Sequence, residues 1–340
     1  MKTNQLKFWL LIGGVAVTLI VIAVFTMYRS GANDGETIST LSNEQYEQWR
    51  QSGMDDPALS EESQRIFGDV AANYDNLLEQ ARTGRVDLVV VLWELRRKCG
   101  DGMELDHCNM LILQYLKNSI APPDNTAVVE LFRKYLAYEE TMMAYTMPSG
   151  ISDAERHQLL MEKRRELLGL EATDLFFGFE AAQFDFAESF VEFRNSTANM
   201  PPEKRIAAYE DLRKKMYGQY YEALREKEPA FDTYTMEMEL RSNSLASMST
   251  AEQSAQTRAV RERYFGRDGA DRMAAVDRQL ADEQQREDTY RAAEADFLRQ
   301  NAGLSESEKK QALSKLRVQI LGAEEAEAYA RREELAQASK

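Results

Sequence analysis

The feature of this sequence that most restricts its fold is a segment that recurs after 97 residues. Six residues of the first copy have identical counterparts in the second: Ser152, Ala154, Glu155, Arg164, Gly169 and Asp174 match Ser249, Ala251, Glu252, Arg261, Gly266 and Asp271. Each copy begins with the Ser-x-x-Glu pattern of a helix cap, continues as a charged helix, and reaches a glycine before a second helix. Because the identities fall on cap and stop positions, the sequence predicts a tandem duplication of helical hairpins.

Two further segments carry signals for the start of a helix. Ser305 and Glu308 form a third Ser-x-x-Glu pattern, and Pro201-Pro202 starts a helix that is expected to run from Glu203 to about Glu228. Proline is scarce, with 7 in 340 residues, while Ala, Glu, Gln, Leu and Arg dominate the second half of the chain. Such residues favour long helices. We therefore expect an all-α protein, built as an extended, curved array of helices rather than a compact bundle.

The charge of the chain limits its partners. Its formal net charge is −15 and its pI is near 4.9. Binding of nucleic acid needs a basic surface that replaces the counterions of the phosphates. The short basic runs, such as Lys163-Arg164-Arg165, lie among acidic residues. We therefore expect no nucleic acid partner.

An uncharged apolar run from Phe8 to Met27 dominates the amino terminus. About 20 residues suffice for a helix to cross the ~30 Å hydrocarbon layer of a membrane. Lys2 and Lys7 precede the run, which favours a cytoplasmic amino end. We expect a single-pass protein of the bacterial inner membrane with its body on the periplasmic side: a tail at 1–7, a transmembrane anchor at 8–28 and a tether at 29–57. A cleaved secretory signal is the alternative, although no Ala-x-Ala site ends the run.

The two cysteines, Cys99 and Cys108, enclose the turn-rich segment GDGMELDH. In an oxidising periplasm such a pair is expected to form a short local disulfide. A metal site made of Cys99, His107 and Cys108 is the alternative, but it lacks a fourth ligand and the usual Cys-x-x-Cys spacing.

Breaks in the pattern divide the exported part into three regions. A helix is expected from Ser60 to Leu78, and the run from Val86 to Leu95 fits either a strand or a buried helix. Pro122-Pro123 ends this first part. We predict a small helical domain at 58–121, an extended helical domain at 122–248, and the second repeat with a second small helical domain at 249–340.

Aromatic residues follow two faces of the helix after Gly169. One stripe is Phe176, Phe179, Phe186, Phe190 and Phe193, and the other is Phe177, Phe184 and Val191. About half of the circumference is then apolar. We expect an aromatic stripe to be core in the first place. A thin helical array has little interior, however, so some of this surface is expected to face a partner.

The sequence contains no pattern that indicates catalysis. Its two histidines, His107 and His157, lie in no catalytic pattern, and its abundant carboxylates form no recognisable pair. We therefore expect a protein that is not an enzyme, with no cofactor and no metal. A structural scaffold of the cell envelope and an enzyme acting on envelope polymers are the alternatives.

Five segments, in this order behind the expected anchor, resemble the lipase-specific foldases, also called lipase chaperones. They are LFRKYLAYEE (131–140), RRELLGLEATDLFFGFEAAQFDF (164–186), MPPEKR (200–205), TRAVRERYFGRDGADRMAAVDRQL (257–280) and LSESEKKQALSKLR (304–317). The resemblance implies an all-helical periplasmic protein in which two small helical domains, joined by an extended helical arm, wrap around a secreted lipase. It further implies a steric foldase that acts about one to one, without ATP and before type II secretion. On this reading the second stripe, with Phe177 and Phe184, is a candidate lipase-binding surface.

The family signature for lipase activation, Arg-x-x-Phe-Asp-Tyr followed by a Ser/Thr-Ala step, is only partly present. The nearest stretch, Arg65-Ile66-Phe67-Gly68-Asp69-Val70, is shifted by one residue and lacks the aromatic residue and the Ser-Ala step. The resemblance therefore gives Arg65, Phe67 and Asp69 as candidate activation residues of a divergent member, whose client could also be another exported hydrolase.

Overall fold

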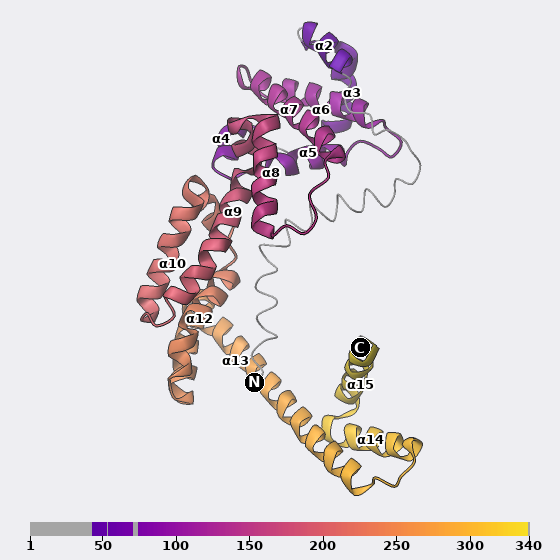
Figure 1. Ribbon diagram of the computed structural model, residues 1–340, viewed down its shortest axis with the longest axis vertical. Coiled ribbons are helices and arrows are strands. Elements are labelled where there is room, and N and C mark those ends of the chain that lie inside the picture. The colour runs from indigo at the N-terminus through magenta and orange to yellow at the C-terminus, as the bar shows by residue number, and fades with distance from the viewer. Residues whose placement is uncertain (1–42, 53, 71–73, 339–340) are drawn as a thin grey trace. The chain divides into compact units, whose positions relative to one another are not determined.

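The computed structural model describes residues 43–52, 54–70 and 74–338, and every regular element in these ranges is helical. In chain order (Figure 1), the elements are α2 (Asn43–Gln51), α3 (Pro57–Phe67), α4 (Leu77–Arg82), α5 (Leu88–Arg96), α6 (Leu105–Ser119), α7 (Asp124–Ala144), α8 (Asp153–Leu168), α9 (Leu170–Ser196), α10 (Pro202–Tyr217), the 3₁₀ turn η2 (Gly218–Tyr220), α11 (Tyr221–Lys227), α12 (Ala230–Ala246), α13 (Thr250–Gln300), α14 (Glu306–Leu321) and α15 (Ala323–Ala338). The all-α prediction is confirmed for these residues.

The predicted membrane anchor, Phe8–Met27, lies outside the residues that the structure describes. Among the helices from α2 onward, none combines the length and the apolar character needed to cross a bilayer. The chain divides into two compact units, one that ends at Glu228 and one that starts at Pro229.

Helix α6 is the centre of the first unit. Every residue from Cys108 to Leu116 is buried, and α3, α5 and α7 pack around this helix. Burying one Leu, Ile or Phe side chain contributes roughly 1.5–3 kcal/mol. The largest apolar side chains with no exposed surface here are Phe67, Leu88, Leu92, Leu111, Ile112, Leu113, Leu116, Val128 and Phe132.

The ambiguous run from Val86 to Leu95 forms helix α5. The carboxylate of Asp87 accepts hydrogen bonds from the backbone N–H groups of Val89 (2.8 Å) and Val90 (3.1 Å), which fixes the start of the helix. Leu88, Leu92 and Leu95 then share a buried face. In a strand, Leu95 would point to the side opposite Leu88 and Leu92, because successive side chains alternate.

The helix predicted from Ser60 to Leu78 is shorter in the structure, so this prediction was wrong. Helix α3 starts at Pro57, behind the capping carboxylate of Asp56, and ends at Phe67. Gly68 forms its carboxyl-terminal cap, as expected from the low helix propensity of glycine. Asp69 therefore lies just after α3 and not within it.

The helix predicted from Glu203 to about Glu228 was also too long. Helix α10 ends at Tyr217 because Gly218 has a φ angle of 50°, and the chain continues as η2 and α11. The aromatic stripe of α9 packs against this region. The ring of Phe190 lies 5.7 Å from that of Tyr209, and the ring of Phe179 lies 5.8 Å from that of Tyr220.

The second unit consists of α12 to α15. Its buried apolar cluster is small and contains Tyr290, Leu321, Ala326 and Tyr329. Helix α13 is bent at Gly266, where φ is 71° and ψ is 176°, so it consists of two helical segments, 250–265 and 267–300. No residue of this second segment from 271 to 289 is buried.

Candidate functional site

The predicted hairpins share one construction. In α8, α13 and α14 the cap serine and the glutamate three residues later exchange hydrogen bonds. In α8, for example, the N–H of Ser152 donates to Glu155 Oε2 (2.8 Å) and the N–H of Glu155 donates to Ser152 Oγ (3.2 Å). The hydrogen bonds from the cap serine hold the pKa of Glu155 below its usual value. The three Ser-x-x-Glu caps expected from the sequence are therefore confirmed.

A glycine ends each of these capped helices. Gly169, Gly266 and Gly322 have φ angles of 82°, 71° and 87° and ψ angles of 168°, 176° and 163°. Residues other than glycine almost never adopt this backbone conformation. The glycine therefore sets the direction in which the second helix of each hairpin leaves the first.

One arginine joins each hairpin to the helix that precedes it, and we call this contact an arginine bridge. In the first hairpin Arg164 Nε donates to the hydroxyl of Tyr138 on α7 (3.3 Å), and its terminal nitrogens pair with Glu180 on α9 (3.0 and 3.1 Å). Arg164 itself lies on α8. A single side chain thus connects three successive helices.

The other two hairpins have the same bridge with the same kinds of partner. The contacts are Arg261 with the Tyr234 hydroxyl (3.0 Å) and with Asp277, and Arg317 with the Tyr290 hydroxyl (3.3 Å) and with Glu333 (2.8 Å). In every copy the arginine lies five residues before the glycine and 16 residues before the acid. The bridge is therefore part of the repeat.

A fourth, altered copy lies between the first two that the sequence revealed. Arg213 also lies five residues before a glycine of positive φ, Gly218, and it pairs with Glu228 (2.8 Å). Pro201 occupies the cap position, and Phe186 occupies the place of the tyrosine and offers no hydroxyl. The pattern Arg-x-x-x-x-Gly occurs in all four copies, at 164–169, 213–218, 261–266 and 317–322, and once outside them, at 97–102. An acid 15 or 16 residues after the arginine separates the four copies from the stretch at 97–102.

Among the three bridges that contain a tyrosine, the first has the most buried arginine. The guanidinium of Arg164 lies 3.6 Å from the ring centroid of Phe177, and its side chain is 5% exposed. Burial acts to lower the pKa of Arg164, but Glu180 and Tyr138 outweigh it and raise this pKa. Burial also raises the pKa of Tyr138. Arg164 therefore keeps its charge and Tyr138 keeps its proton near neutral pH.

The three candidate activation residues occupy different environments. Phe67 is fully buried, with its ring 5.2 Å from that of Tyr115, whereas the side chain of Arg65 is 75% exposed. The side chain of Asp69 is also exposed, and its carboxylate lies 3.0 Å from Lys98 Nζ. Arg65 and Asp69 can therefore meet a partner directly, but Phe67 has no surface with which to do so.

The second aromatic stripe of α9 emerges from the core along the helix. Phe177 is buried, Phe184 is partly buried and stacks on His157 with ring centroids 3.8 Å apart, and Val191 is 62% exposed. Helix α8 has 16 residues and α9 has 27, so α8 covers only the first part of α9. Val191 lies beyond the covered part. The exposed part of this stripe is the end that contains Phe184 and Val191.

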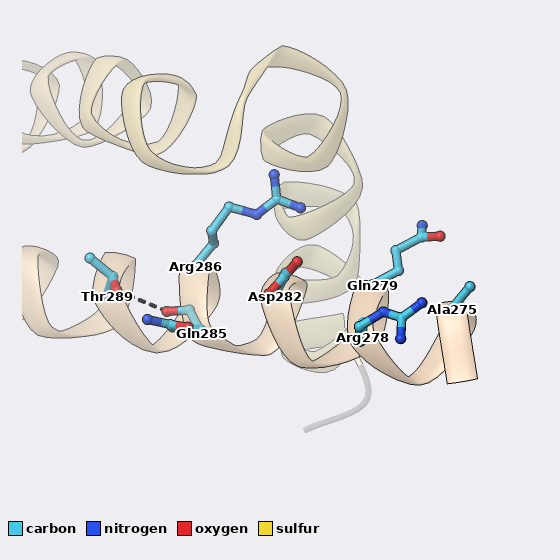
Figure 2. A pocket seen from close by; sticks show the side chains of 7 residues that line it. All are labelled: Ala275, Arg278, Gln279, Asp282, Gln285, Arg286 and Thr289. Atoms are coloured by element: carbon cyan, nitrogen blue, oxygen red, sulfur yellow. Dashed lines mark hydrogen bonds between the residues drawn. The ribbon is translucent and has the colours of Figure 1, made fainter. Parts of the chain in front are cut away.

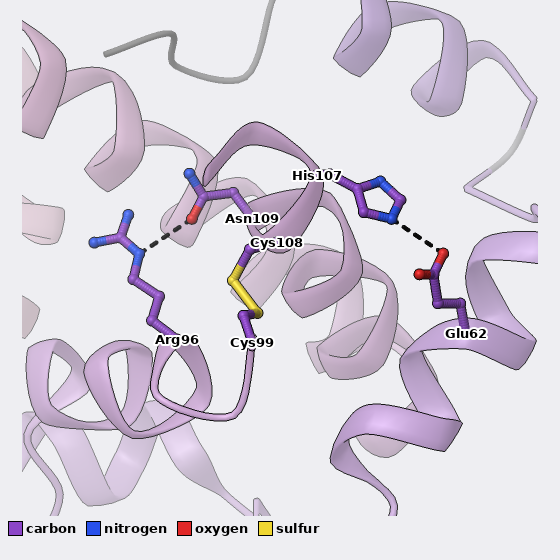
Figure 3. The surroundings of a disulfide bond; sticks show 6 residues. All are labelled: Glu62, Arg96, Cys99, His107, Cys108 and Asn109. Carbon is purple, nitrogen blue, oxygen red and sulfur yellow. Dashed lines mark hydrogen bonds and ion pairs between the residues drawn. A yellow bond between two sulfur atoms is a disulfide. The ribbon is translucent and has the colours of Figure 1, made fainter. Parts of the chain in front are cut away.

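The two cysteines are joined in the structure. Their Sγ atoms lie 2.12 Å apart and their Cα atoms 6.0 Å apart (Figure 3). The disulfide connects the end of α5 to the start of α6. Beside it, Arg96 Nε donates to Asn109 Oδ1 (3.1 Å), and the guanidinium of Arg96 pairs with Glu139 of α7 (2.7 Å). His107 points away from the sulfur atoms and toward Glu62.

One uncovered surface of the second unit lies on α13. No residue from 271 to 289 is buried. Val276 and Leu280, four residues apart and so on one face, are 54% and 57% exposed. On another side of the helix, a groove of about 670 Å³ is lined by Ala275, Arg278, Gln279, Asp282, Gln285, Arg286 and Thr289 (Figure 2). An uncovered helix with an apolar and a polar side is suited to binding another protein.

Comparison with known proteins points to a single family. The model of the proteobacterial lipase chaperone protein matches residues 131–326, which is more than half of the chain. The match contains all four Arg-x-x-x-x-Gly copies and the uncovered segment 271–289, while the disulfide and the stretch 65–69 lie before it. Neither a curated protein nor a solved structure matches the chain.

Proposed function

Because the chain belongs to the proteobacterial lipase chaperone family, we propose that it assists the folding of a secreted lipase, binding it about one to one. The observation that carries the proposal is the family match, which spans the hairpins and the uncovered part of α13. The finer elements of the proposal are an anchor in the inner membrane, a periplasmic site of action and independence of ATP. The extended and curved arrangement of helices around the lipase belongs to the same proposal.

The uncovered segment 271–289 supports a gripping role. Val276 and Leu280 offer apolar area to a client that still exposes apolar surface, and the polar groove beside them allows release. A foldase that uses no nucleotide can act only by binding late folding states more tightly than early ones. Many weak contacts along a helix suit this task better than one deep pocket. They can form together only when the lipase surface is close to its folded shape.

We assign Phe184 and Val191 to a client-binding surface of the first unit, and Arg65 and Asp69 to activation of the lipase. Both pairs have exposed side-chain surface. Phe67 and Phe177 are core residues, so their contribution is to the position of α3 and of Arg164. This assignment departs from the family signature, which is incomplete in this chain.

The proposal is tested by refolding. Denatured lipase from the same organism is diluted into buffer without nucleotide, with the chain lacking residues 1–29 at equal concentration or in large excess. The proposal predicts a higher yield of active lipase with the chain than without it. Equal yields in the two samples would reject the foldase and favour a structural scaffold of the envelope.

Variants test whether residues 271–289 bind the lipase. The double change Val276→Ser and Leu280→Ser should weaken lipase binding about tenfold or more, as expected when an apolar anchor is lost from an interface. Leu335→Ser is the matched control, because Leu335 is 73% exposed but lies beyond the family match. An equal effect of both changes on affinity would remove 271–289 from the binding surface.

A second variant tests Phe184. Phe184→Asp should weaken binding with the helical circular dichroism unchanged if the ring faces the lipase. If the ring is mainly core, the same change should unfold the first unit, because a buried unpaired carboxylate costs several kcal/mol. Loss of helicity would therefore remove Phe184 from the proposed surface.

A further inference from the structure

Two residues next to the disulfide contact α3 and the chain just after it. Lys98 precedes Cys99, and its Nζ lies 3.2 and 3.0 Å from the two carboxylate oxygens of Asp69. His107 precedes Cys108, and its Nε2 lies 3.0 Å from Oε2 of Glu62 on α3 (Figure 3). The disulfide thus lies between two contacts that reach the segment from Glu62 to Asp69 from both ends of one short loop.

We propose that Lys98 and His107 are positioning residues, and that the disulfide holds them where they fix the carboxyl-terminal part of α3. In this arrangement Asp69 acts through Lys98 and does not touch the lipase, and the side chain that α3 presents to the lipase is Arg65. The inference rests on the proposed function, because lipase refolding is its readout. It adds to that function the contacts that orient the segment from Glu62 to Asp69, which bears Arg65.

The two contacts contribute little to the stability of the fold. The side chains of Lys98 and Asp69 are 43% and 74% exposed, and exposed ion pairs contribute about 0–1 kcal/mol. Helix α3 is already attached by the buried ring of Phe67 and by the hydrogen bond from Asn118 Nδ2 to Ser60 Oγ (2.7 Å). The Lys98–Asp69 contact can determine the direction in which the chain leaves α3, because Gly68 separates Phe67 from Asp69. The His107–Glu62 contact can determine the position of α3 itself.

The disulfide is needed for this placement but not for the packing of α5 on α6. The loop that it closes contains Gly100 and Gly102, and Gly102 has a φ angle of 91°, so without the bond its ends would move independently. The contact of Arg96 with Asn109 and Glu139 also joins α5 to its neighbours. A chain without the disulfide therefore keeps its core and loses the fixed positions of Lys98 and His107.

The arrangement of Arg65 agrees with this division of roles. Its side chain is 75% exposed, and its one ionic contact within the described part of the chain is with Glu62 at 3.7 Å, at the long end of such contacts. Glu62 in turn is the residue that His107 holds. The Lys98–Asp69 and His107–Glu62 contacts therefore fix helix α3, which bears Arg65. The guanidinium of Arg65 can still turn toward another protein.

The experiment is a charge exchange in the full chain, solubilised in mild detergent. Lys98→Asp and Asp69→Lys are compared singly and together, and both the yield of active lipase and the affinity for lipase are measured. Each single change should lower the yield about fivefold, the size of effect that an exposed ion pair can have, with the affinity nearly unchanged. The combined change restores the pair with reversed charges and should restore the yield.

Two further variants complete the test. Cys99→Ser combined with Cys108→Ser should lower the yield as the single charge changes do, without loss of helicity. Arg50→Asp is the matched control, because Arg50 forms an exposed pair with Glu47 on α2, far in sequence from the disulfide loop. This control should refold lipase like the unchanged chain.

The possible failures are distinguishable. If the combined change refolds lipase as poorly as Asp69→Lys alone, Asp69 touches the lipase itself and the inference is overturned. Unchanged yields in all variants would overturn it as well. If the unchanged chain gives no refolding, the proposed function fails, and the inference fails with it.

Discussion

Helix α6 and the middle of α13 are two helical segments of this chain with opposite environments. All residues of α6 from Cys108 to Leu116 are buried, whereas none from 271 to 289 of α13 is. The side chains of α6 from Cys108 to Leu116 pack in the core of the first unit, so they are unavailable to a partner. The segment of α13 is held mainly at its ends, so its side chains can bind another protein.

Three ionic contacts involve residues of the exposed segment. Asp271 pairs with Arg258 (2.8 Å), Asp277 pairs with Arg261, and Glu287 pairs with Arg291 (3.3 Å). Only Glu287 and Arg291 are four positions apart on one helix, and such a pair contributes about 0.2–0.5 kcal/mol. The other two pairs join the two helical segments of α13 across Gly266. The exposed segment keeps its helical form because the arginine bridges and the caps hold the hairpins at both ends.

The sharpest contrast is expected from shortening one apolar side chain in each helix. Ile112→Ala on α6 should lower the free energy of unfolding by about 2–5 kcal/mol, because it leaves a cavity in a closed core. Val276→Ala on α13 should change it by less than about 0.5 kcal/mol. Urea unfolding followed by circular dichroism measures both. Similar values for the two variants would contradict the contrast.

The arginine bridges allow the same comparison between hairpins. Arg164→Met should cost about 3 kcal/mol, near the low end of the range for a buried pair, because Glu180 retains some solvent contact. Arg317→Met should cost about 1 kcal/mol or less, since Arg317 and Glu333 are 17% and 39% exposed and solvent screens the pair. Thermal unfolding of the two variants tests the order, and a larger effect of Arg317→Met would reverse it.

The glycine at the turn of a hairpin is expected to have an effect between those of Arg164→Met and Arg317→Met. Gly322→Ala should destabilise the chain by about 1–3 kcal/mol, because alanine must adopt φ 87° and ψ 163°. Gly303→Ala is the control in the same unit, since a Cβ would meet no atom within 4 Å at either position and only Gly322 has a positive φ angle. Alanine at 303 should leave the unfolding temperature nearly unchanged, and an equal loss at both positions would argue against the strain.

The smallest effect concerns pH and the stack of His157 on Phe184. Burial lowers the pKa of His157 below 6.5, against the opposing effect of Glu180. The unfolded chain therefore binds this proton at a higher pH than the folded chain does. The stability due to neutral His157 is complete above pH 6.5 and is lost as the pH falls from 6.5 through the lower pKa of the folded state.

Replacement of the ring separates this effect from other titrations. His157→Phe keeps an aromatic partner for Phe184 and cannot bind a proton. The difference in unfolding free energy between this variant and the unchanged chain should vary with pH just below 6.5. A difference that stays constant over this range would show that His157 is not protonated on unfolding.

Local features of the fold were predictable from the sequence, and contacts between distant residues were not. The caps at Ser152, Ser249 and Ser305 depend on residues three positions apart, so the pattern predicted them. The bridge of Arg164 depends on a tyrosine 26 residues earlier and an acid 16 residues later. Its meaning appears only when the three helices are in place, although the spacing Arg-x-x-x-x-Gly is visible in the sequence.

The candidate site was predictable to a similar degree. Helical periodicity placed Phe177 and Phe184 on one stripe, but it could not show that α8 covers the first and leaves Val191 exposed. The apolar spacing through Ile66 and Val70 concealed the end of α3 at Gly68, so the environment of Asp69 was missed. The exposure of Val276 and Leu280 was missed as well, because a sequence does not show whether a neighbouring helix covers an apolar face.

The most direct test of this account is amide hydrogen exchange of the chain, alone and bound to its lipase during refolding. The account predicts slow exchange in α6 in both samples, because that helix is closed in the core. It predicts faster exchange in residues 271–289 of the free chain and a slowing by about tenfold or more in the complex. Unchanged exchange in 271–289, with protection appearing only elsewhere, would contradict the claim that this uncovered helix grips the lipase.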